Sequence, residues 1–319
     1  MESFFELVQE QLLQVEEHIQ AQAEGYHPEL HAALEHLLAS GGKRIRPTLV
    51  LLAGQMLEVQ AGPLITLAAA VELLHTATLV HDDLIDGSLL RRGNPTLNAR
   101  WSPAATVLTG DFLFARAAKL ASELNSPPAL RVFSNALATI VDGEVRQMFI
   151  SRGQANRQDY EQRIYAKTAS LFEASMVTIG ILSEAGESIR TALKQFGYEL
   201  GMAFQIVDDI LDFTGEQSTV GKPVASDLRQ GLVTLPALYY LEANPHNTEM
   251  RAILNQETYD EADFASLLDQ IRSSDAIAQA AEEALQYKAR AVLAAGSLPD
   301  SKERVALLEM ADYIVNRRL

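Results

Sequence analysis

The stretch LVHDDLID at residues 79–86 places three carboxylates inside an otherwise apolar pattern of helical period. On a helix with about 3.6 residues per turn, Asp82 and Asp86 lie one above the other, and Asp83 lies about 100° round the helix axis. Like charges in this arrangement repel, so a partner of opposite charge is expected. A single DDxxD motif is equally compatible with a solvated acidic helix end, and taken alone it leaves both interpretations open.

A second copy of the motif decides between these interpretations. The stretch GMAFQIVDDILD at residues 201–212 repeats the spacing with Asp208, Asp209 and Asp212 behind another apolar run. Because each of two buried helices has an acidic face, we predict that the two faces line one cation site. Both motifs fall at or near the C-terminal end of a helix, where the helix dipole disfavours anions. A hard cation that takes oxygen ligands and shares its shell with water or phosphate is most simply Mg²⁺.

Periodicity and composition predict a large all-α protein. Of the 319 residues, 48% are hydrophobic; they recur at three- and four-residue spacing, and the alternating runs of a sheet do not appear. No linker or internal repeat interrupts the pattern, which predicts one domain over residues 1–319. The expected helices span 2–22, 28–39, 46–60, 63–87, 103–124, 127–151, 157–184, 187–214, 234–243, 258–294 with a break near 273, and 299–318.

Charge and cysteine content argue against several classes of protein. The net charge of −16 argues against a general nucleic-acid binder, which would carry a basic surface. Cysteine is absent, which removes disulfide frameworks and thiolate metal sites and fits a reducing compartment. The acidic N-terminus lacks the features of a signal peptide, and no apolar stretch is judged to reach membrane-spanning length. We therefore expect a cytoplasmic protein without a transmembrane segment.

Basic residues cluster beside the acidic motifs in spite of the negative net charge. GGKRIRP at 41–47 joins a glycine turn, which lets backbone approach an anion closely, to three cations. RRG at 91–93 follows the first motif, and guanidinium groups bind phosphate bidentately. GKPVASDL at 221–228 follows the second motif, and Lys167 lies in an apolar helix between them. Singly, each is also compatible with a solvated charge. Together they suit a substrate that carries diphosphate on an apolar body.

With these motifs the chain closely resembles the trans-isoprenyl diphosphate synthases, also called polyprenyl synthetases, over nearly its whole length. Six landmarks in order carry the resemblance: GGKRIRP at 41–47, HDDLIDGSLLRRG at 81–93, GDFLFA at 110–115, KT at 167–168, GMAFQIVDDILD at 201–212 and GKPVASDL at 221–228. The resemblance implies the isoprenoid synthase fold, a single large bundle of mostly antiparallel helices around a deep central cavity, commonly as a homodimer. It also implies successive trans condensations of an allylic diphosphate with isopentenyl diphosphate.

The resemblance further implies a role for each matching residue. The direct Mg²⁺ ligands would be Asp82, Asp86 and Asp208, with several ions in the site and with support from Asp83, Asp209 and Asp212. The allylic diphosphate would contact Arg91, Lys167 and Lys222. The pocket for isopentenyl diphosphate would contain Lys43, Arg46, His75 and Arg92. Thr168 and Gln205 would face the reacting carbons.

Two positions depart from the family pattern. Relatives often have a lysine after the glycine at Gly231, but here Leu232 follows. One diphosphate contact is therefore missing, or Arg229 replaces it. Ala225 stands where a glycine is common in relatives. Neither position touches the expected metal ligands, so both departures concern only the loop after the second motif.

The residues before the first motif predict the length of the product. Leu74, Ala77 and Thr78 share one helix face, and Thr78 lies one turn, about 6 Å, behind Asp82. In short-chain members of the family a bulky aromatic residue commonly occupies one of the positions matching Ala77 and Thr78. Both residues are small here, as in the octaprenyl and solanesyl type, which predicts a hexaprenyl to decaprenyl product. The alternative is that Ala77 only allows close helix packing.

Three other functions remain as alternatives. A farnesyl or geranylgeranyl diphosphate synthase would share every motif and differ only in product length. A non-catalytic subunit of a heteromeric prenyl synthase would be expected to have lost one DDxxD motif or the Lys43 and Arg46 pair, and all of these are intact. A terpene cyclase would ionise an allylic diphosphate in the same way, but it has no use for GGKRIRP at 41–47.

Overall fold

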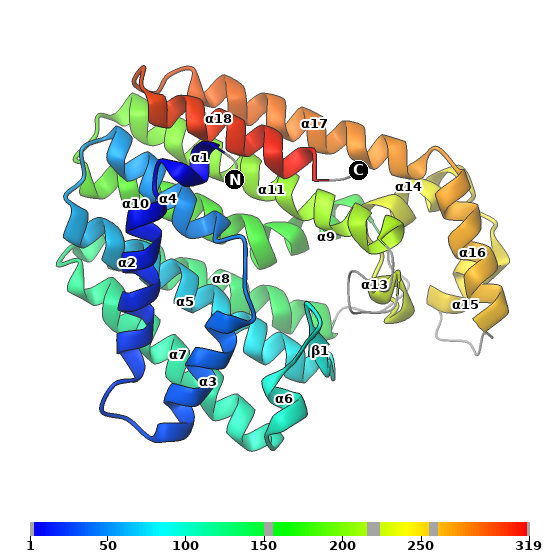
Figure 1. Cartoon of the computed structure of the whole chain (residues 1–319). Coiled ribbons are helices and arrows are strands. Elements are labelled where there is room, and N and C mark those ends of the chain that lie inside the picture. Colours follow the sequence, from blue (N-terminus) through cyan, green and yellow to red (C-terminus); the bar gives the residue numbers. More distant parts are fainter. Residues whose placement is uncertain (1–2, 150–155, 216–223, 255–260, 318–319) are drawn as a thin grey trace. The chain divides into compact units, whose positions relative to one another are not determined.

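The computed structural model describes residues 3–149, 156–215, 224–254 and 261–317, and helix dominates these ranges (Figure 1). The first elements are α1 (Ser3–Glu6), α2 (Gln9–Gln20), η1 (Ala21–Ala23), α3 (Pro28–Ala39), α4 (Ile45–Met56), α5 (Ala61–Ile85), α6 (Leu97–Arg100), α7 (Pro103–Glu123) and α8 (Pro127–Phe149). They continue with α9 (Arg157–Ile164), η2 (Tyr165–Ala169), α10 (Ser170–Leu182), α11 (Glu187–Thr214), α13 (Ser226–Arg229), α14 (Leu235–Ala243), α15 (Thr248–Leu254), α16 (Glu261–Ser273), α17 (Ala276–Ala295) and α18 (Lys302–Val315). The all-α prediction is confirmed.

The helices group into two compact units. Unit 1 comprises Met1–Leu137, Leu171–Gly197 and Ala294–Met310. Unit 2 comprises Ala138–Ser170, Tyr198–Leu293 and Ala311–Leu319. Helices α8, α10, α11, α17 and α18 contribute residues to both units. The first acidic motif belongs to unit 1 and the second to unit 2.

Unit 1 is organised around α5, the helix that carries the first acidic motif. Helices α2, α4 and α7 pack against it. By length and composition α5 could cross a membrane, so the expectation that no stretch reaches that length was wrong. Its most apolar window is 61% buried inside the protein, however. A helix that is apolar on most of its circumference and covered by neighbours is a core helix.

Two glycines allow the close packing of α5. A side chain at Gly54 of α4 would clash with Leu64 of α5, and one at Gly110 of α7 would clash with the ring of His81. The His81 Nε2 atom also lies 3.1 Å from the backbone oxygen of Val107, a hydrogen bond that joins α5 to α7. The glycine that opens GDFLFA therefore brings α7 against the last turns of α5, next to the acidic motif.

Local sequence explains where several of these helices begin. Pro28 and Pro103 stand in the first turns of α3 and α7, where a missing N–H costs nothing. Ser102 caps α7 by accepting from the Ala105 N–H, and Asn156 caps α9 by accepting from the Asp159 N–H. These caps fix the starts of the helices close to their expected residues.

Several local features differ from the periodicity-based expectation, among them the short helices α6, α13 and α15, which lie outside every expected helix. The first helix breaks after Glu6, so α1 and α2 replace one helix over 2–22. Strand β1 (Leu90–Arg91) pairs antiparallel with β2 (Asn94–Pro95), and the turn between them has positive φ at Arg92 (53°) and at Gly93 (77°). Such a two-residue turn matches the twist of a hairpin. The segment η2, predicted as ordinary helix, is a π-helical turn.

Candidate functional site

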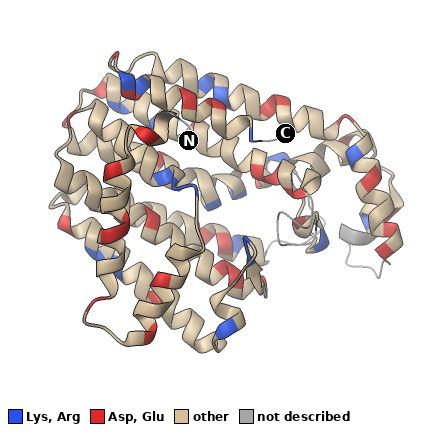
Figure 2. Cartoon of the chain, viewed as in Figure 1, with Lys and Arg blue, Asp and Glu red and all other residues tan. Residues whose placement is uncertain are grey.

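The first acidic motif closes α5 (Figure 2). Helix α5 ends at Ile85, and Asp86 forms its C-cap, with the Asp86 N–H donating to the Asp82 carbonyl oxygen at 2.8 Å. Asp82 is partly exposed, Asp86 is exposed and Asp83 is buried. The predicted position at a helix C-terminus is therefore correct, and the helix dipole adds to the repulsion among these carboxylates.

The β1–β2 hairpin directs its two arginines to different partners. The Arg91 Nε donates to both carboxylate oxygens of Asp83, at 2.9 and 3.0 Å, and the Arg91 Nη2 lies 2.8 Å from Asp83 Oδ1. The Arg92 Nη1 donates to the backbone oxygen of Gly41. The hairpin thus ties the first acidic motif to the GGKRIRP turn within unit 1.

The three basic side chains of the GGKRIRP turn differ in their contacts and in their exposure. Arg44, at positive φ (49°), precedes α4, and its Nε donates to Glu16 Oε1 at 2.9 Å. The Arg44 Nη1 also donates to Oε1 of the buried Glu72 at 3.2 Å. Arg46 is buried with its guanidinium 4.9 Å from the centre of the Phe172 ring, whereas Lys43 is exposed. Arg44 therefore anchors the turn.

His75 lies where the positive charges of unit 1 converge. The residue is largely enclosed, and its pKa is lowered well below 6.5, first by burial and then by the charges of Arg46, Arg91, Arg92 and Arg44. A neutral imidazole surrounded by guanidinium groups is an environment that favours an anion. Among the residues expected to bind isopentenyl diphosphate, Arg46, His75 and Arg92 therefore share one electrostatic neighbourhood.

The second acidic motif is tied into a hydrogen-bond chain in unit 2. The Thr168 hydroxyl donates to Gln205 Oε1 at 2.6 Å, and the Gln205 Nε2 donates to Asp209 Oδ1 at 2.8 Å. The Tyr160 hydroxyl donates to Asp209 Oδ2 at 2.7 Å. Burial, followed by the charge of Asp227, raises the pKa of Asp209 to about 7. The structure thus brings Thr168 and Gln205 together.

Asp212 holds the start of α13, where the loop after the second motif ends. Its carboxylate accepts from the Ser226 N–H at 3.2 Å and from the Ser226 hydroxyl at 3.1 Å. Burial, followed by the charge of Asp227, raises the pKa of Asp212 to about 6. Ala225 adopts positive φ (53°), a conformation that glycine adopts at lower cost, so the departure from glycine introduces local strain.

The other basic residues expected at this site contact different carboxylates. The Lys167 Nζ lies 3.0 Å from Glu144 Oε1, and Lys167 and Thr168 both belong to the π-helical turn η2. Such turns are frequent at functional sites. Arg229 donates from both Nη atoms to Glu261, at 2.9 and 2.5 Å, so this carboxylate engages the residue considered as a replacement for the missing lysine. Lys222 lies outside the described residues.

The first residue of the second motif, Asp208, pairs with a residue near the C-terminus. The Arg317 Nη1 lies 3.3 Å from Asp208 Oδ1, with 10% and 39% of the two side chains exposed. The Arg317 guanidinium also lies 4.1 Å from the centre of the Phe204 ring. No sequence signal beyond the charge of Arg317 pointed to this contact.

The three residues expected to control chain length differ in exposure. Leu74 and Ala77 have no exposed surface, and Thr78 is partly exposed. The Thr78 hydroxyl donates to the His75 backbone oxygen at 2.8 Å. A larger side chain at position 77 must therefore displace neighbours, and this constraint is weaker at the partly exposed position 78.

The carboxylates fit a divalent cation by the chemistry of the donor set. Within the described residues, no three carboxylate or imidazole side chains lie close enough to hold a metal without help. Mg²⁺ does not require such a cage, because it usually binds one or two carboxylates and takes water and substrate phosphates for the rest. Burial first, and then the negative charge of Asp227, raises the pKa values of Asp209 and Asp212, and a bound cation would stabilise both carboxylates in the charged form.

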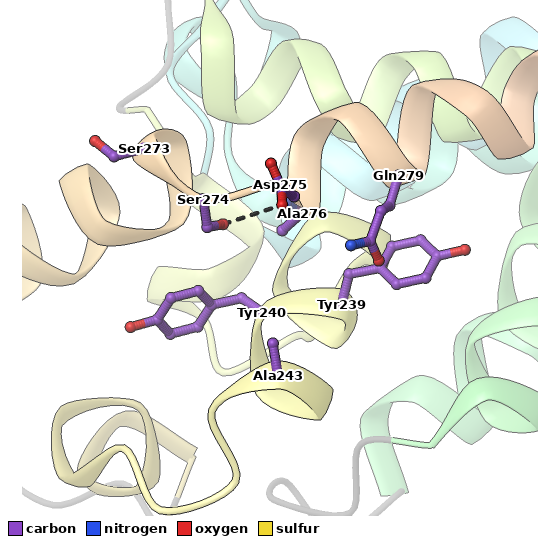
Figure 3. Close-up of a pocket in the computed structure, with 8 residues that line it drawn as sticks. All are labelled: Tyr239, Tyr240, Ala243, Ser273, Ser274, Asp275, Ala276 and Gln279. Carbon is purple, nitrogen blue, oxygen red and sulfur yellow. Dashed lines mark hydrogen bonds between the residues drawn. The ribbon is translucent and has the colours of Figure 1, made fainter.

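A separate hollow of about 290 Å³ lies in unit 2 (Figure 3). It is lined by Tyr239, Tyr240, Ala243, Ser273, Ser274, Asp275, Ala276 and Gln279. The Ser274 hydroxyl accepts from the Ala276 N–H at 3.2 Å, a contact that starts α17. None of the expected site residues lines this hollow.

Sequence reasoning missed several residues that support the site. Tyr160 and Asp227 act on the second motif, Glu144 holds Lys167, and Glu72 holds Arg44. Glu72 had a weak signal, because it is an acidic residue in the most apolar helix. Tyr160 is buried on α9, whereas Glu144 and Asp227 lie on α8 and α13. A single tyrosine or acidic residue in a helix gives no sequence signal of such a contact.

Comparisons with known proteins agree with the geometry. The family model described as "Polyprenyl synthetase" matches residues 27–271. The chain is 37% identical to the heptaprenyl diphosphate synthase component 2 of Bacillus subtilis (strain 168), over 95% of this chain and 87% of that protein. It is 35% identical to the octaprenyl diphosphate synthase of Escherichia coli (strain K12), over 88% of each chain. A polyprenyl synthase from Caulobacter crescentus CB15, solved with calcium and isoprenyl diphosphate, has a TM-score of 0.93 at 36% identity, over 99% of this chain and 97% of that one.

Proposed function

This chain belongs to the polyprenyl synthetase family, and we propose that it is a prenyltransferase that makes a long-chain all-trans polyprenyl diphosphate. Its substrates are an allylic diphosphate primer and isopentenyl diphosphate. Similarity to relatives named for heptaprenyl and octaprenyl products supports a product in the hexaprenyl to decaprenyl range.

Each cycle of the proposed reaction exchanges one bond for another. The bond between the allylic C1 and its diphosphate oxygen breaks, and C1 bonds to C4 of isopentenyl diphosphate. A proton then leaves C2 of the isopentenyl unit, and the released diphosphate is the base in our proposal. Negative charge therefore develops on the leaving diphosphate, and cationic side chains stabilise it there. No side-chain nucleophile is needed.

The observation that carries the proposal is that four arginines surround neutral His75 on α5, the helix that ends in the first acidic motif. In the proposal Arg91 and Lys167 bind the allylic diphosphate together with Lys222, which lies outside the described residues. The set that binds isopentenyl diphosphate is Lys43, Arg46, His75 and Arg92. Thr168 and Gln205, already hydrogen-bonded to each other, face the reacting carbons.

The proposed metal is Mg²⁺, which when bound neutralises charge on the leaving diphosphate. Asp82, Asp86 and Asp208 are its proposed ligands, and Asp83, Asp209 and Asp212 support them. The solved relative with calcium and isoprenyl diphosphate supports a divalent cation in this family. The partly exposed Asp82 and the exposed Asp86 are accessible to such an ion.

The proposal is tested by incubating the purified chain with farnesyl diphosphate, isopentenyl diphosphate and Mg²⁺, with mass analysis of the products. We expect polyprenyl diphosphates longer than geranylgeranyl, no product with excess chelator, and a rate lower by about 10²-fold or more in Asp82→Ala and Asp208→Ala. A loss of less than about tenfold in both variants would contradict the metal assignment.

The same experiment separates the alternative functions. Turnover of the allylic diphosphate alone would indicate a cyclase, and a product that stops at geranylgeranyl would indicate a short-chain synthase. The Bacillus subtilis relative is named as one component of its synthase. Absence of turnover by the purified chain, with metal and both substrates present, would therefore favour a subunit that needs a partner protein.

Three further features belong to the proposal. We propose a homodimer, supported by the exposed apolar side chains of Val141, Val145, Met148 and Phe149 on α8, which a second copy would cover. We propose that residues 1–319 form one domain, since five helices contribute residues to both units. We also propose a cytoplasmic location, supported by the absence of cysteine.

A further inference from the structure

The ion pair between Arg317 and Asp208 joins a C-terminal residue to a proposed metal ligand within unit 2. Arg317 follows the last turn of α18, and its Nε donates to the Ile314 backbone oxygen at 3.1 Å. Its Nη1 lies 3.3 Å from Asp208 Oδ1, and its guanidinium lies 4.1 Å from the centre of the Phe204 ring. Since Phe204 lies one turn before Asp208 on α11, three contacts position this guanidinium at the second acidic motif.

A second observation concerns the remaining nitrogen of the same side chain. The Arg317 Nη2 is buried and has no hydrogen-bond partner. A buried N–H donor without a partner is costly, and native proteins usually satisfy such groups with protein, water or ligand atoms. A guanidinium with one donor still unmatched is suited to a phosphate oxygen, which accepts charge-assisted hydrogen bonds.

We propose that Arg317 competes with the divalent cation for Asp208, and that the displaced guanidinium then binds the substrate diphosphate. The inference rests on the proposed function, because it takes Asp208 as a metal ligand. Both groups are cations that bind the same carboxylate, so each weakens the binding of the other. Phe204 keeps the guanidinium near the site after the exchange, because the face of an aromatic ring attracts a cation even when no carboxylate is bound to it.

This exchange gives Arg317 two effects of opposite sign. Without substrate it weakens binding of the cation, because the cation must displace a guanidinium whose side chain is only 10% exposed. With substrate it strengthens binding of the diphosphate, because Nη2 and Nη1 gain phosphate acceptors. A residue that only supported the fold would change both in the same direction.

The test uses the full chain and Arg317→Gln, which keeps a polar side chain but removes the charge. Isothermal titration with MgCl₂ alone should show tighter binding in Arg317→Gln by about three- to tenfold. The apparent KM for the allylic diphosphate at saturating Mg²⁺ should rise by about tenfold or more. The double variant Arg317→Gln/Arg318→Gln repeats both measurements, so that the neighbouring arginine cannot replace the lost charge.

Two controls separate the possible failures. Lys288→Gln breaks the ion pair between Lys288 Nζ and Asp312 Oδ1, 2.8 Å apart between α17 and α18, and should change neither constant. Asp208→Asn should weaken binding of Mg²⁺, and if it does not, the metal assignment in the proposed function fails. If Asp208→Asn weakens binding but the double arginine variant leaves the Mg²⁺ dissociation constant unchanged or raises it, the competition by Arg317 is refuted and the proposed function stands.

Discussion

Arg91 and Asp83 form the most completely matched ion pair of the first acidic motif. The Arg91 Nε donates to both oxygens of Asp83, at 2.9 and 3.0 Å, and Nη2 lies 2.8 Å from Oδ1. Only 9% of the Asp83 side chain is exposed, so solvent screens the pair weakly. The middle residue of this DDxxD motif therefore orients an arginine, while Asp82 and Asp86 remain more accessible.

The first prediction follows from this pair. Asp83→Asn should raise the KM for the allylic diphosphate by about tenfold, because residues that orient a binding group typically affect function by 10- to 100-fold. Asp142→Asn, which breaks the exposed pair of Asp142 with Arg146, is the matched control and should leave the KM unchanged. Equal KM values for Asp83→Asn and wild type would mean that Arg91 does not depend on Asp83.

A second prediction concerns Arg44, which anchors the GGKRIRP turn through Glu72. Arg44→Met removes the guanidinium that donates to the buried Glu72 carboxylate, and it should lower the free energy of unfolding by about 3–5 kcal/mol. The KM for isopentenyl diphosphate should rise more than that for the allylic substrate, because the turn carries Lys43 and Arg46. Adding Glu72→Gln should recover part of the stability, as measured by denaturant unfolding. No recovery would show that the two residues are not coupled.

A third prediction concerns the pH dependence caused by His75. The pKa of His75 is lowered in the folded chain, so below about 6.5 the unfolded chain takes up a proton that the folded chain does not. The contribution of His75 to the free energy of unfolding is therefore fully present above about pH 6.5. Below that pH it falls by up to about 1.4 kcal/mol per pH unit, until the pH reaches the pKa of His75 in the folded chain. His75→Asn should flatten the dependence, as measured by denaturant unfolding at pH 7.5 and 5.5. An unchanged slope would exclude His75 as its source.

Ligand binding should shift the same group in the opposite direction. A diphosphate beside His75 stabilises the charged imidazole, so the pKa should rise on binding and a proton should be taken up. Calorimetric titration with isopentenyl diphosphate, in buffers of different ionisation enthalpy, measures that proton. The uptake by wild type should exceed the uptake by His75→Asn; equal uptake would place the diphosphate away from His75.

The fourth prediction concerns product length. Ala77→Phe and Thr78→Phe should both shorten the product towards farnesyl or geranylgeranyl diphosphate and leave the first condensation largely intact. Because Ala77 has no exposed surface, Ala77→Phe should also destabilise the protein by about 1–3 kcal/mol, and Thr78→Phe should do so less.

Ala68→Phe is the matched control for product length. Ala68 is equally buried but lies on the opposite side of α5, nine residues before Ala77. It should destabilise the protein without shortening the product, as measured by unfolding and by mass analysis. Unchanged product lengths in Ala77→Phe and Thr78→Phe would show that this face does not line the path of the growing chain.

The sequence alone was sufficient for the parts of the protein that depend on neighbours along the chain. Apolar residues at helical spacing predicted α5 and α11, and the DDxxD spacing predicted acidic ends on both, because helical period and cap chemistry are local properties. The six ordered motifs identified the family for the same reason, since each lies within one short segment.

Only the tertiary structure decided which charged side chains meet. In GGKRIRP the sequence does not distinguish Arg44 from Arg46, yet one pairs with Glu16 and Glu72 and the other stacks on Phe172. Arg317 and Asp208 are far apart in the sequence and carry no shared pattern. Ion pairs of this kind depend on how the helices pack, and packing is set by many distant contacts together, so no local spacing in the chain records them.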